Sequence, residues 1–160
     1  MADHTMIEVT QVHEDLYARY GDDLTRFATG LVGPSDAADV VSDAMVHFWR
    51  SRALVDADNP RALLYRGVLA SARNLQRSRF RRRAREQATA QRLVSHDPEI
   101  RPDVVAAVLQ LSPRQRACVF LAYWDDLGME QIGELLDITP GSVKQHLHRA
   151  RQILEEVLDE

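Results

Sequence analysis

The chain of 160 residues has few of the residues that mark special classes of protein. It contains a single cysteine, Cys118, and therefore no internal disulfide, which argues against a secreted, disulfide-stabilised scaffold. Its 7 glycines and 6 prolines are too few for a collagen-like or wholly disordered chain. It has no long apolar run, and its first residues lack the basic start and apolar core of a signal peptide. We therefore expect a soluble, cytoplasmic protein without membrane insertion.

Catalytic and metal-binding motifs are missing as well. The sequence has no glycine-rich phosphate loop, no Cys-x-x-Cys pair and no nucleophile elbow. Its 6 histidines are not spaced with cysteine or carboxylates in the way that metal ligands usually are. Cys118 stands between apolar neighbours, which is typical of a core residue. We therefore expect no enzymatic activity, no cofactor and no bound metal.

The net charge of −4 at pH 7 conceals an uneven distribution of charge. Residues 1–60 carry 4 basic against 11 acidic residues, and residues 93–160 carry 6 against 12. Residues 61–92 instead carry 10 arginines and one acidic residue. A basic segment between acidic flanks indicates polyanion binding, although such a stretch is also often a generic solvated face. All 20 basic residues except Lys144 are arginine, which suits phosphate recognition or reflects a GC-rich genome.

Apolar residues recur at helical spacing along the chain, and no strand-like alternation is sustained. This pattern predicts an all-α protein. A first helix is expected over residues 9–31, and a second after Gly33-Pro34, with Ser35 or Asp36 as its N-cap. A third helix is expected to run from about Arg61 into the arginine-rich segment.

Residues 87–103 are polar and contain helix breakers, which predicts a flexible linker. The linker separates two small helical domains, of residues 1–86 and 104–160. In the second domain the spacing predicts one helix over residues 104–111 and another over residues 114–127. The residues of the latter helix that we expect to face inward are Ala117, Phe120, Leu121 and Trp124.

The strongest local motif is a helix-turn-helix between Gly128 and Arg151. A short amphipathic helix leads to a turn at Asp137-Ile138, and Thr139 and Pro140 are suited to the N-cap and first position of a second helix. The buried stripe of this second helix is predicted to be Val143, Leu147, Ala150 and Leu154. The residues near its N-terminal end that can reach bases and phosphates in a major groove are Ser142, Lys144, Gln145, His148 and Arg149. A helical hairpin in an ordinary bundle is the alternative.

Two stretches of the sequence resemble bacterial RNA polymerase sigma factors of the extracytoplasmic-function class, group IV of the sigma-70 family. Leu111–Arg116, followed by the helix-turn-helix, resembles region 4, which binds the −35 promoter element. Asp36–Arg50 resembles the region 2 helix by which sigma factors bind the clamp of core RNA polymerase. LuxR-type regulators share part of the first pattern, so it is the occurrence of both regions, in the right order, that makes the likeness specific.

The resemblance implies sets of functional residues. The family usually has an acidic residue, a Gln and a Glu at the positions of Asp39, Ser42 and Asp43, which are expected to bind core polymerase together with Val46. Residues 72–75 look like the family's Ala-Arg-Asn-Leu, whose Asn helps to capture an unstacked base of the melted −10 element. The residues expected to bind −10 DNA are Arg73, Asn74, Arg77, Arg79, Arg81 and Arg82. Those expected to bind the −35 element are the outward-facing residues of the helix-turn-helix.

The alignment of the third predicted helix with the −10-binding helix of the family can be shifted by one helical turn. The stretch from Pro60 to Asn74 is about one helical turn longer than is usual in the family. Ala70 is therefore the alternative to Asn74 as the position that corresponds to the base-capturing residue.

The resemblance implies a sigma factor that binds core RNA polymerase and directs promoter-specific transcription initiation. Its expected partners are core RNA polymerase, promoter DNA and an anti-sigma factor. Two alternatives are a free-standing helix-turn-helix regulator and a sigma mimic that only binds an anti-sigma factor. A clamp-binding helix and an arginine-rich helix in one chain favour the sigma factor over both.

Overall fold

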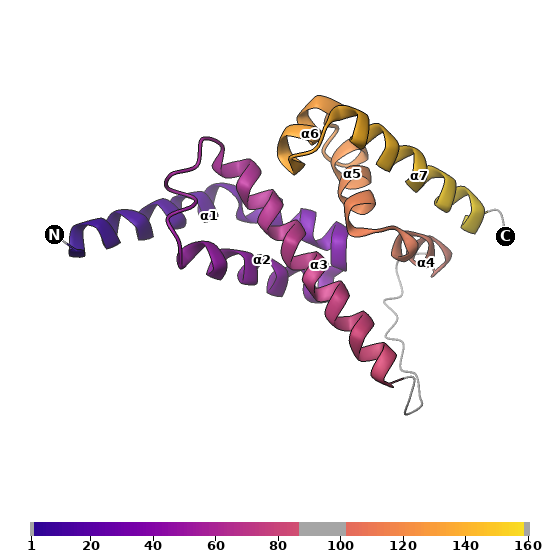
Figure 1. Ribbon diagram of the computed structural model, residues 1–160, viewed down its shortest axis with the longest axis horizontal. Helices are drawn as coiled ribbons and strands as arrows, with labels where there is room; N and C mark the ends of the chain where they lie inside the picture. The colour runs from indigo at the N-terminus through magenta and orange to yellow at the C-terminus, as the bar shows by residue number, and fades with distance from the viewer. Residues whose placement is uncertain (1, 87–101, 159–160) are drawn as a thin grey trace.

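All regular structure that the computed structural model describes, in residues 2–86 and 102–158, is α-helical (Figure 1). The helices are α1 (Ala2–Val32), α2 (Pro34–Trp49), α3 (Pro60–Glu86), α4 (Pro102–Gln110), α5 (Pro113–Tyr123), α6 (Met129–Leu136) and α7 (Pro140–Leu158). The all-α prediction is thus confirmed for this part of the chain. No helix in it is long and apolar enough to cross a membrane. Most of the predicted linker lies outside the described residues, and its last two residues, Pro102 and Asp103, already belong to α4.

The break between α1 and α2 differs from the prediction. Gly33 occupies the N-cap position with a φ of 88°, a conformation that glycine adopts without strain, and Pro34 is the first helical residue. The expectation that Ser35 or Asp36 caps α2 is therefore wrong. Asp36 instead lies in the first turn, where a carboxylate is favoured by the helix dipole, and it accepts a hydrogen bond from Arg79.

Helices α1, α2 and α3 pack around a core of aliphatic and aromatic side chains. The buried residues are Ala37, Val40, Val41, Ala44, Met45 and Phe48 from α2, and Ala62, Leu64, Tyr65, Val68, Leu69, Ser71 and Ala72 from α3. The two helices approach closely at Gly67, where a Cβ atom would lie 2.5 Å from Cε2 of Phe48. This packing determines which faces of α2 and α3 remain open to solvent.

The C-terminal helices form a second unit, in which α5 begins with a capping box. The Ser112 hydroxyl accepts a hydrogen bond from the Gln115 backbone, and the Gln115 side chain accepts one from the Ser112 backbone. Cys118, which was predicted to be a core residue, is fully buried in this helix, and burial raises the pKa of its thiol to about 11.

One prediction for α5 is wrong. Ala117 and Leu121 are buried and Phe120 is half-buried, but Trp124 is 78% exposed. Trp124 is the C-cap of α5 and keeps helical backbone angles, with its N–H bonded to the Phe120 carbonyl, so it continues the Phe120 side of the helix, which is only half-buried. The Trp124 ring instead stacks on Phe120, with ring centroids 6.1 Å apart.

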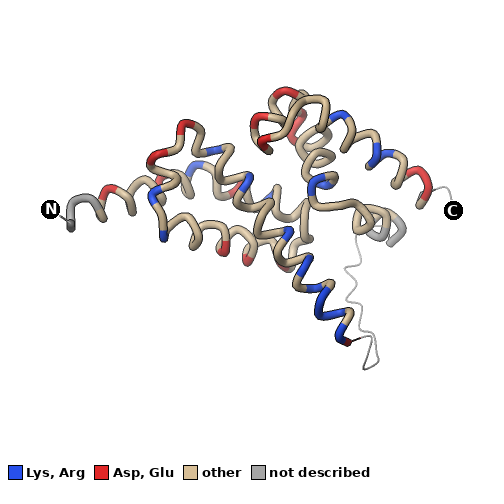
Figure 2. Tube along the Cα trace, in the orientation of Figure 1, with Lys and Arg blue, Asp and Glu red and all other residues tan. Residues whose placement is uncertain are grey.

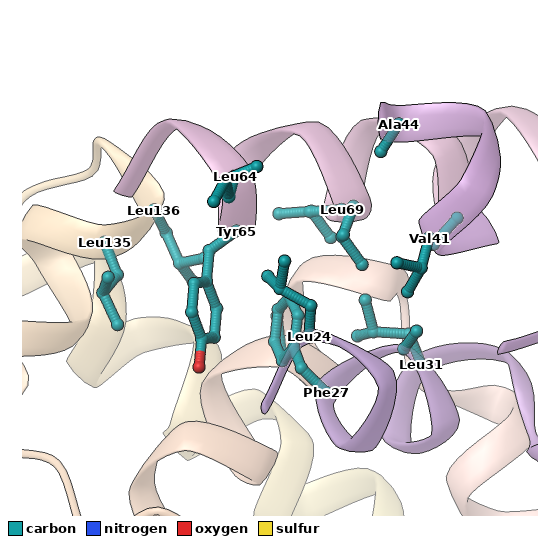
Figure 3. Packing of buried hydrophobic residues seen from close by; sticks show 14 of the residues in the cluster. Leu24, Phe27, Leu31, Val41, Ala44, Leu64, Tyr65, Leu69, Leu135 and Leu136 are labelled. Carbon is teal, nitrogen blue, oxygen red and sulfur yellow. The ribbon is translucent and has the colours of Figure 1, made fainter. Parts of the chain in front are cut away.

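The two helical units share one hydrophobic core. Helix α1 packs against α5, and α3 packs against α5 and α6. Tyr65 lies at the centre of this contact, between residues of α1 and α6 (Figure 3), and is 1% exposed. Its ring centroid lies 4.9 Å from that of Phe27, which in turn meets Phe120 edge-on at 5.9 Å. The sequence pattern predicted two units but did not predict that they share a core.

A buried arginine joins the two units. Arg116 is 7% exposed, and its Nη1 donates a hydrogen bond of 2.7 Å to the carbonyl of Leu31, near the end of α1. Its Nε and Nη2 donate to the carbonyls of Val108 and Leu109, near the end of α4, at 3.0 and 2.7 Å. Carbonyls in the last turn of a helix lack partners within the helix and attract positive charge. One guanidinium therefore satisfies helix ends from both units, although burial lowers its pKa.

Candidate nucleic-acid and partner interfaces

The outer face of α2 carries the four residues predicted to bind a protein partner. Asp39, Ser42 and Asp43 are exposed, and Val46 is 41% exposed. They lie opposite the buried stripe of the helix, so the structure brings them together on one face as the spacing predicted. The Asp43 carboxylate also accepts a 2.8 Å hydrogen bond from the Ser71 hydroxyl, which ties α2 to α3. This face is acidic and has an apolar edge.

A groove of about 430 Å³ lies between α2 and α3 beside this face. One wall comes from α2 and the residue that follows it, and the other comes from α3. The residues of the first wall are Asp43, Ala44, Val46, His47, Phe48 and Arg50, and those of the second are Leu63, Arg66, Gly67, Ala70, Ser71 and Asn74. The volume falls in the range of sites that hold small molecules. Apolar walls with hydroxyl, amide and guanidinium groups can surround a flat ring and hydrogen-bond its polar edge.

Both registers of the −10 helix lead to this groove. Ala70 and Asn74 are exposed, lie one helical turn apart on α3 and line the same wall. A shift of four residues in the alignment with the family therefore does not change which face of α3 lines the groove. It changes only whether the side chain at the base-capturing position is the methyl group of Ala70 or the amide of Asn74.

The second half of α3 projects away from the rest of the molecule (Figure 1) and carries most of the arginines (Figure 2). Every residue from Arg77 to Glu86 is exposed. Two of the predicted −10 arginines form ion pairs within the protein: Arg79 with Asp36 at 2.6 Å, and Arg82 with Glu86 at 2.8 Å. Arg73 is half-buried, while Arg77 and Arg81 are exposed on the side of α3 that continues from Asn74.

The turn between α6 and α7 has the geometry of the predicted helix-turn-helix. Asp137 ends α6 with a φ of 55°, and the preceding helix needs Gly133 because a Cβ there would lie 2.6 Å from the carbonyl oxygen of Ile138. The Thr139 hydroxyl accepts a 3.1 Å hydrogen bond from the Ser142 backbone, and Pro140 is the first residue of α7. The predicted cap and turn are therefore confirmed.

The outer side of α7 is cationic and open. Val143 and Ala150 are fully buried, Leu147 and Leu154 are half-buried, and Lys144, Gln145, His148 and Arg149 are exposed. Ser142 differs from these four, because it is half-buried and its hydroxyl bonds to that of Thr139. On the same helix, burial and then the nearby Arg114 and Arg149 lower the pKa of His146, which favours its neutral form.

Sequence reasoning missed two features, the burial of His13 and the exposure of Phe80. His13 is completely buried, with its ring nitrogens against the carbonyls of Val9 and Phe48, and links α1 to the end of α2. Phe80 is 74% exposed in the middle of the arginine-rich half of α3. Phe80 stands among arginines in the sequence, but its position there does not show that its ring lies in solvent.

Comparison with known families gives two matches along the chain. The description "Sigma-70 region 2" fits residues 16–86, and "Sigma-70, region 4" fits residues 102–154. The RNA polymerase sigma-E factor of Streptomyces antibioticus is 30% identical over 161 residues, which cover 95% of this chain and 87% of that protein. The ECF RNA polymerase sigma factor SigW of Bacillus subtilis is 35% identical over 60 residues, which cover 38% of this chain and 32% of that protein.

A solved structure has the same fold. It is the sigma factor RpoE of Bartonella quintana, crystallised with the anti-sigma factor NepR. The two chains superpose with a TM-score of 0.58 at 22% identity, over 91% of this chain and 96% of that one.

Proposed function

Because this chain belongs to the sigma-70 family of RNA polymerase sigma factors, in the extracytoplasmic-function class, we propose that α2, α3 and α7 are its contact helices in promoter-specific transcription initiation. The observation that carries the proposal is the presence of both family regions in one chain, each with its expected helix face open to solvent. The chain is a sigma factor that directs initiation, and members of this family have no catalytic step of their own. We place it in the cytoplasm, where core polymerase works in bacteria.

Core RNA polymerase is assigned to the outer face of α2. Asp39, Ser42 and Asp43 offer carboxylates and a hydroxyl to a basic surface, and Val46 offers an apolar edge beside them. The face lies on a helix anchored by a buried stripe and by the Asp43–Ser71 hydrogen bond, so it is largely formed before binding. In this chain the side chains at the second and third positions are shorter than the Gln and Glu usual in the family, and the contact surface is correspondingly smaller.

The −10 element is assigned to the groove and to the projecting half of α3. A base that leaves the DNA stack needs new stacking and hydrogen-bonding partners, and the groove that Asn74 lines offers both. Arg77 and Arg81 continue from this groove along α3, and the half-buried Arg73 lies next to Asn74 in the helix. All three are placed to neutralise the phosphates of the same strand. Arg79 and Arg82 join them after exchanging their carboxylate partners for phosphate.

The −35 element is assigned to the N-terminal half of α7. Lys144 and Gln145 project from its first two turns and are placed to meet base edges in the major groove. His148 and Arg149 lie one turn later, where phosphates are closer. Ser142 is held by Thr139 and is placed to contact the backbone from the helix N-terminus.

Two further assignments rest on the family. We assign region 2 to residues 1–86, a linker to residues 87–103 and region 4 to residues 104–160, with the first turn of α4 extending region 4 back to Pro102. We also propose an anti-sigma factor as a partner, because the sigma factor RpoE, which shares this fold, was crystallised with one.

Transcription in vitro tests the proposal. The full chain is added to purified core RNA polymerase on genomic fragments, and transcripts with defined start sites are expected only when both proteins are present. A free-standing helix-turn-helix regulator would bind DNA without the polymerase and produce no new start sites. A sigma mimic would bind an anti-sigma factor and neither bind nor transcribe the fragments. Either of these results would reject the sigma-factor proposal.

A further inference from the structure

The projecting half of α3, residues 77–86, is strongly basic and exposed along its whole length. It carries 6 arginines and one acidic residue (Figure 2). Arg77, Arg81 and Arg85 follow one another at intervals of four residues and form no ion pair in the described part of the chain. Phe80, which is 74% exposed, lies beside Arg81. This surface therefore offers free guanidinium groups with an apolar ring next to them.

The outer face of α2 has the complementary composition. The helix contains three carboxylates and neither lysine nor arginine. Asp39 and Asp43, also four residues apart, are exposed on this face, and Val46 follows them with 41% of its surface exposed. The face therefore offers two carboxylates and an apolar side chain, in the same spacing as the arginines and the ring of α3.

One ion pair between these two elements already exists within the molecule. Arg79, on the projecting half of α3, pairs with Asp36, in the first turn of α2, at 2.6 Å. Asp39 and Asp43 lie further along α2, and no arginine pairs with them in the part of the chain that the structure describes. Because α3 is one continuous helix, its projecting half cannot fold back to reach them. The projecting half of a second copy of the chain can.

Helix geometry favours an antiparallel contact between the two copies. When Phe80 lies against Val46 in this orientation, a rise of about 1.5 Å per residue places the two carboxylates about 4.5 and 10.5 Å along the contact. Arg81 and Arg85 lie about 1.5 and 7.5 Å along it. Each arginine is therefore about 3 Å from its carboxylate along the axis, which its long side chain can span. In the parallel orientation the second arginine would be Arg73, which is half-buried.

We propose that the free chain forms a two-fold dimer, in which the projecting half of α3 of each copy lies against the outer face of α2 of the other copy. A two-fold axis makes this contact twice and leaves neither surface open for further growth. The dimer goes beyond the proposed function, and its consequence rests on that function. It covers the surfaces assigned to core RNA polymerase and to −10 DNA, so the free chain keeps both of them masked until one of these partners displaces the second copy.

Sedimentation velocity of the full chain, without polymerase or DNA, tests the dimer. Over a range of protein concentrations we expect a dimer at about 0.05 M salt and a monomer at about 0.5 M salt, because salt screens exposed charge pairs. Asp39→Arg and Arg85→Asp should each weaken dimerisation by about tenfold or more, since each brings like charges together in both contacts. Both side chains are exposed, and circular dichroism verifies that each variant is folded.

A mixture of the two variants gives the sharpest test. In the mixed dimer the two substituted positions face each other in one contact with their charges exchanged, and the other contact is that of the wild type. The mixture should therefore dimerise as the wild type does, although neither variant does so alone. Asp22→Arg, which makes the same charge change on the exposed side of α1, is the matched control and should dimerise as the wild type does.

The inference is overturned if the wild type stays monomeric at low salt over the whole range of concentrations, or if a dimer persists at high salt and in both variants. It is also overturned if the mixture is as monomeric as its components. These results are distinct from a failure of the proposed function, because neither polymerase nor DNA is present. That failure would appear as a chain that directs no promoter-specific transcription with core polymerase, whether it dimerises or not.

Discussion

Gly30 provides a sensitive test of the contact between the two helical units. It lies inside α1, and a Cβ atom at this position would be 2.4 Å from Cδ2 of Phe120 on α5. In a helix that made no such contact, Gly30→Ala would stabilise the protein by about 1 kcal/mol, because alanine loses less backbone entropy than glycine. Against Phe120 the added methyl group forces side chains or helices apart, which typically costs about 1–3 kcal/mol.

The expected result is therefore a stability that is unchanged or reduced by up to about 2 kcal/mol, in place of a gain of about 1 kcal/mol. Removing the ring should reverse the sign. In a Phe120→Ala background, Gly30→Ala should become stabilising by about 1 kcal/mol, which gives a coupling free energy of about 1–3 kcal/mol. Urea unfolding of the four proteins, followed by circular dichroism, measures this cycle.

Two other glycines serve as matched controls. Gly67→Ala should destabilise the protein in either background, because the Cβ would lie 2.5 Å from Phe48, within the N-terminal unit. Gly141→Ala should be neutral or slightly stabilising, because the nearest atom outside its own helix backbone is 3.8 Å away. If Gly30→Ala stabilises the protein by about 1 kcal/mol with or without the Phe120 ring, then α1 and α5 do not pack as described.

Four further predictions concern the assigned interfaces. Asp39→Arg should weaken binding to core RNA polymerase by about tenfold or more, because it reverses a charge at the contact. Asn74→Ala should reduce promoter melting, seen as permanganate reactivity, more than it reduces closed-complex binding, because the amide acts on an unstacked base. Gln145→Ala should change which −35 sequences are preferred, at a cost of roughly 1–3 kcal/mol on the best site. Arg149→Ala should weaken all sequences about equally and lower the salt slope by about one unit.

Each of these predictions has a control variant or a result that would contradict it. Asp22→Arg makes the same charge change on the exposed side of α1, so equal loss of polymerase binding would show a general charge effect. Wild-type permanganate reactivity in Asn74→Ala would move the base-capturing position to Ala70, one turn earlier. A randomised −35 library that gives the same preference profile for Gln145→Ala and Arg149→Ala would show that neither side chain reads bases. Specificity would then come from the shape of the DNA.

The parts of the fold that the sequence predicted are those determined by local chemistry. Thr139 caps α7 and Pro140 opens it because a hydroxyl and a ring without an N–H suit these two positions in any helix. The polar face of α7 then follows from the helical repeat alone. Gly33 was missed as the cap of α2 because its role depends on a positive φ that the chain path demands.

The parts that were not predicted depend on contacts between distant segments. Trp124 has the right spacing for an inward-facing residue and keeps the helical backbone, but at the end of α5 its ring stacks on the half-buried Phe120 and stays in solvent. Arg116 is a basic residue in a motif that resembles a DNA-binding region, yet its guanidinium is buried against the ends of α1 and α4. Its partner at Leu31 is 85 positions away, so no spacing rule within one helix reveals it.

Contacts within the protein also determine which arginines are free to bind DNA phosphates. Residues 61–92 carry 10 arginines, but Arg79 and Arg82 already pair with carboxylates. A paired arginine that moves to a phosphate leaves its carboxylate to recover a counterion, so it adds less to the salt dependence than a free one does. Arg77 and Arg81 are exposed, form no ion pair in the described part of the chain, and lie on the stripe that leads from the groove. The salt slope of the −10 contact should therefore follow the number of unpaired arginines on this stripe, not the total charge of the segment.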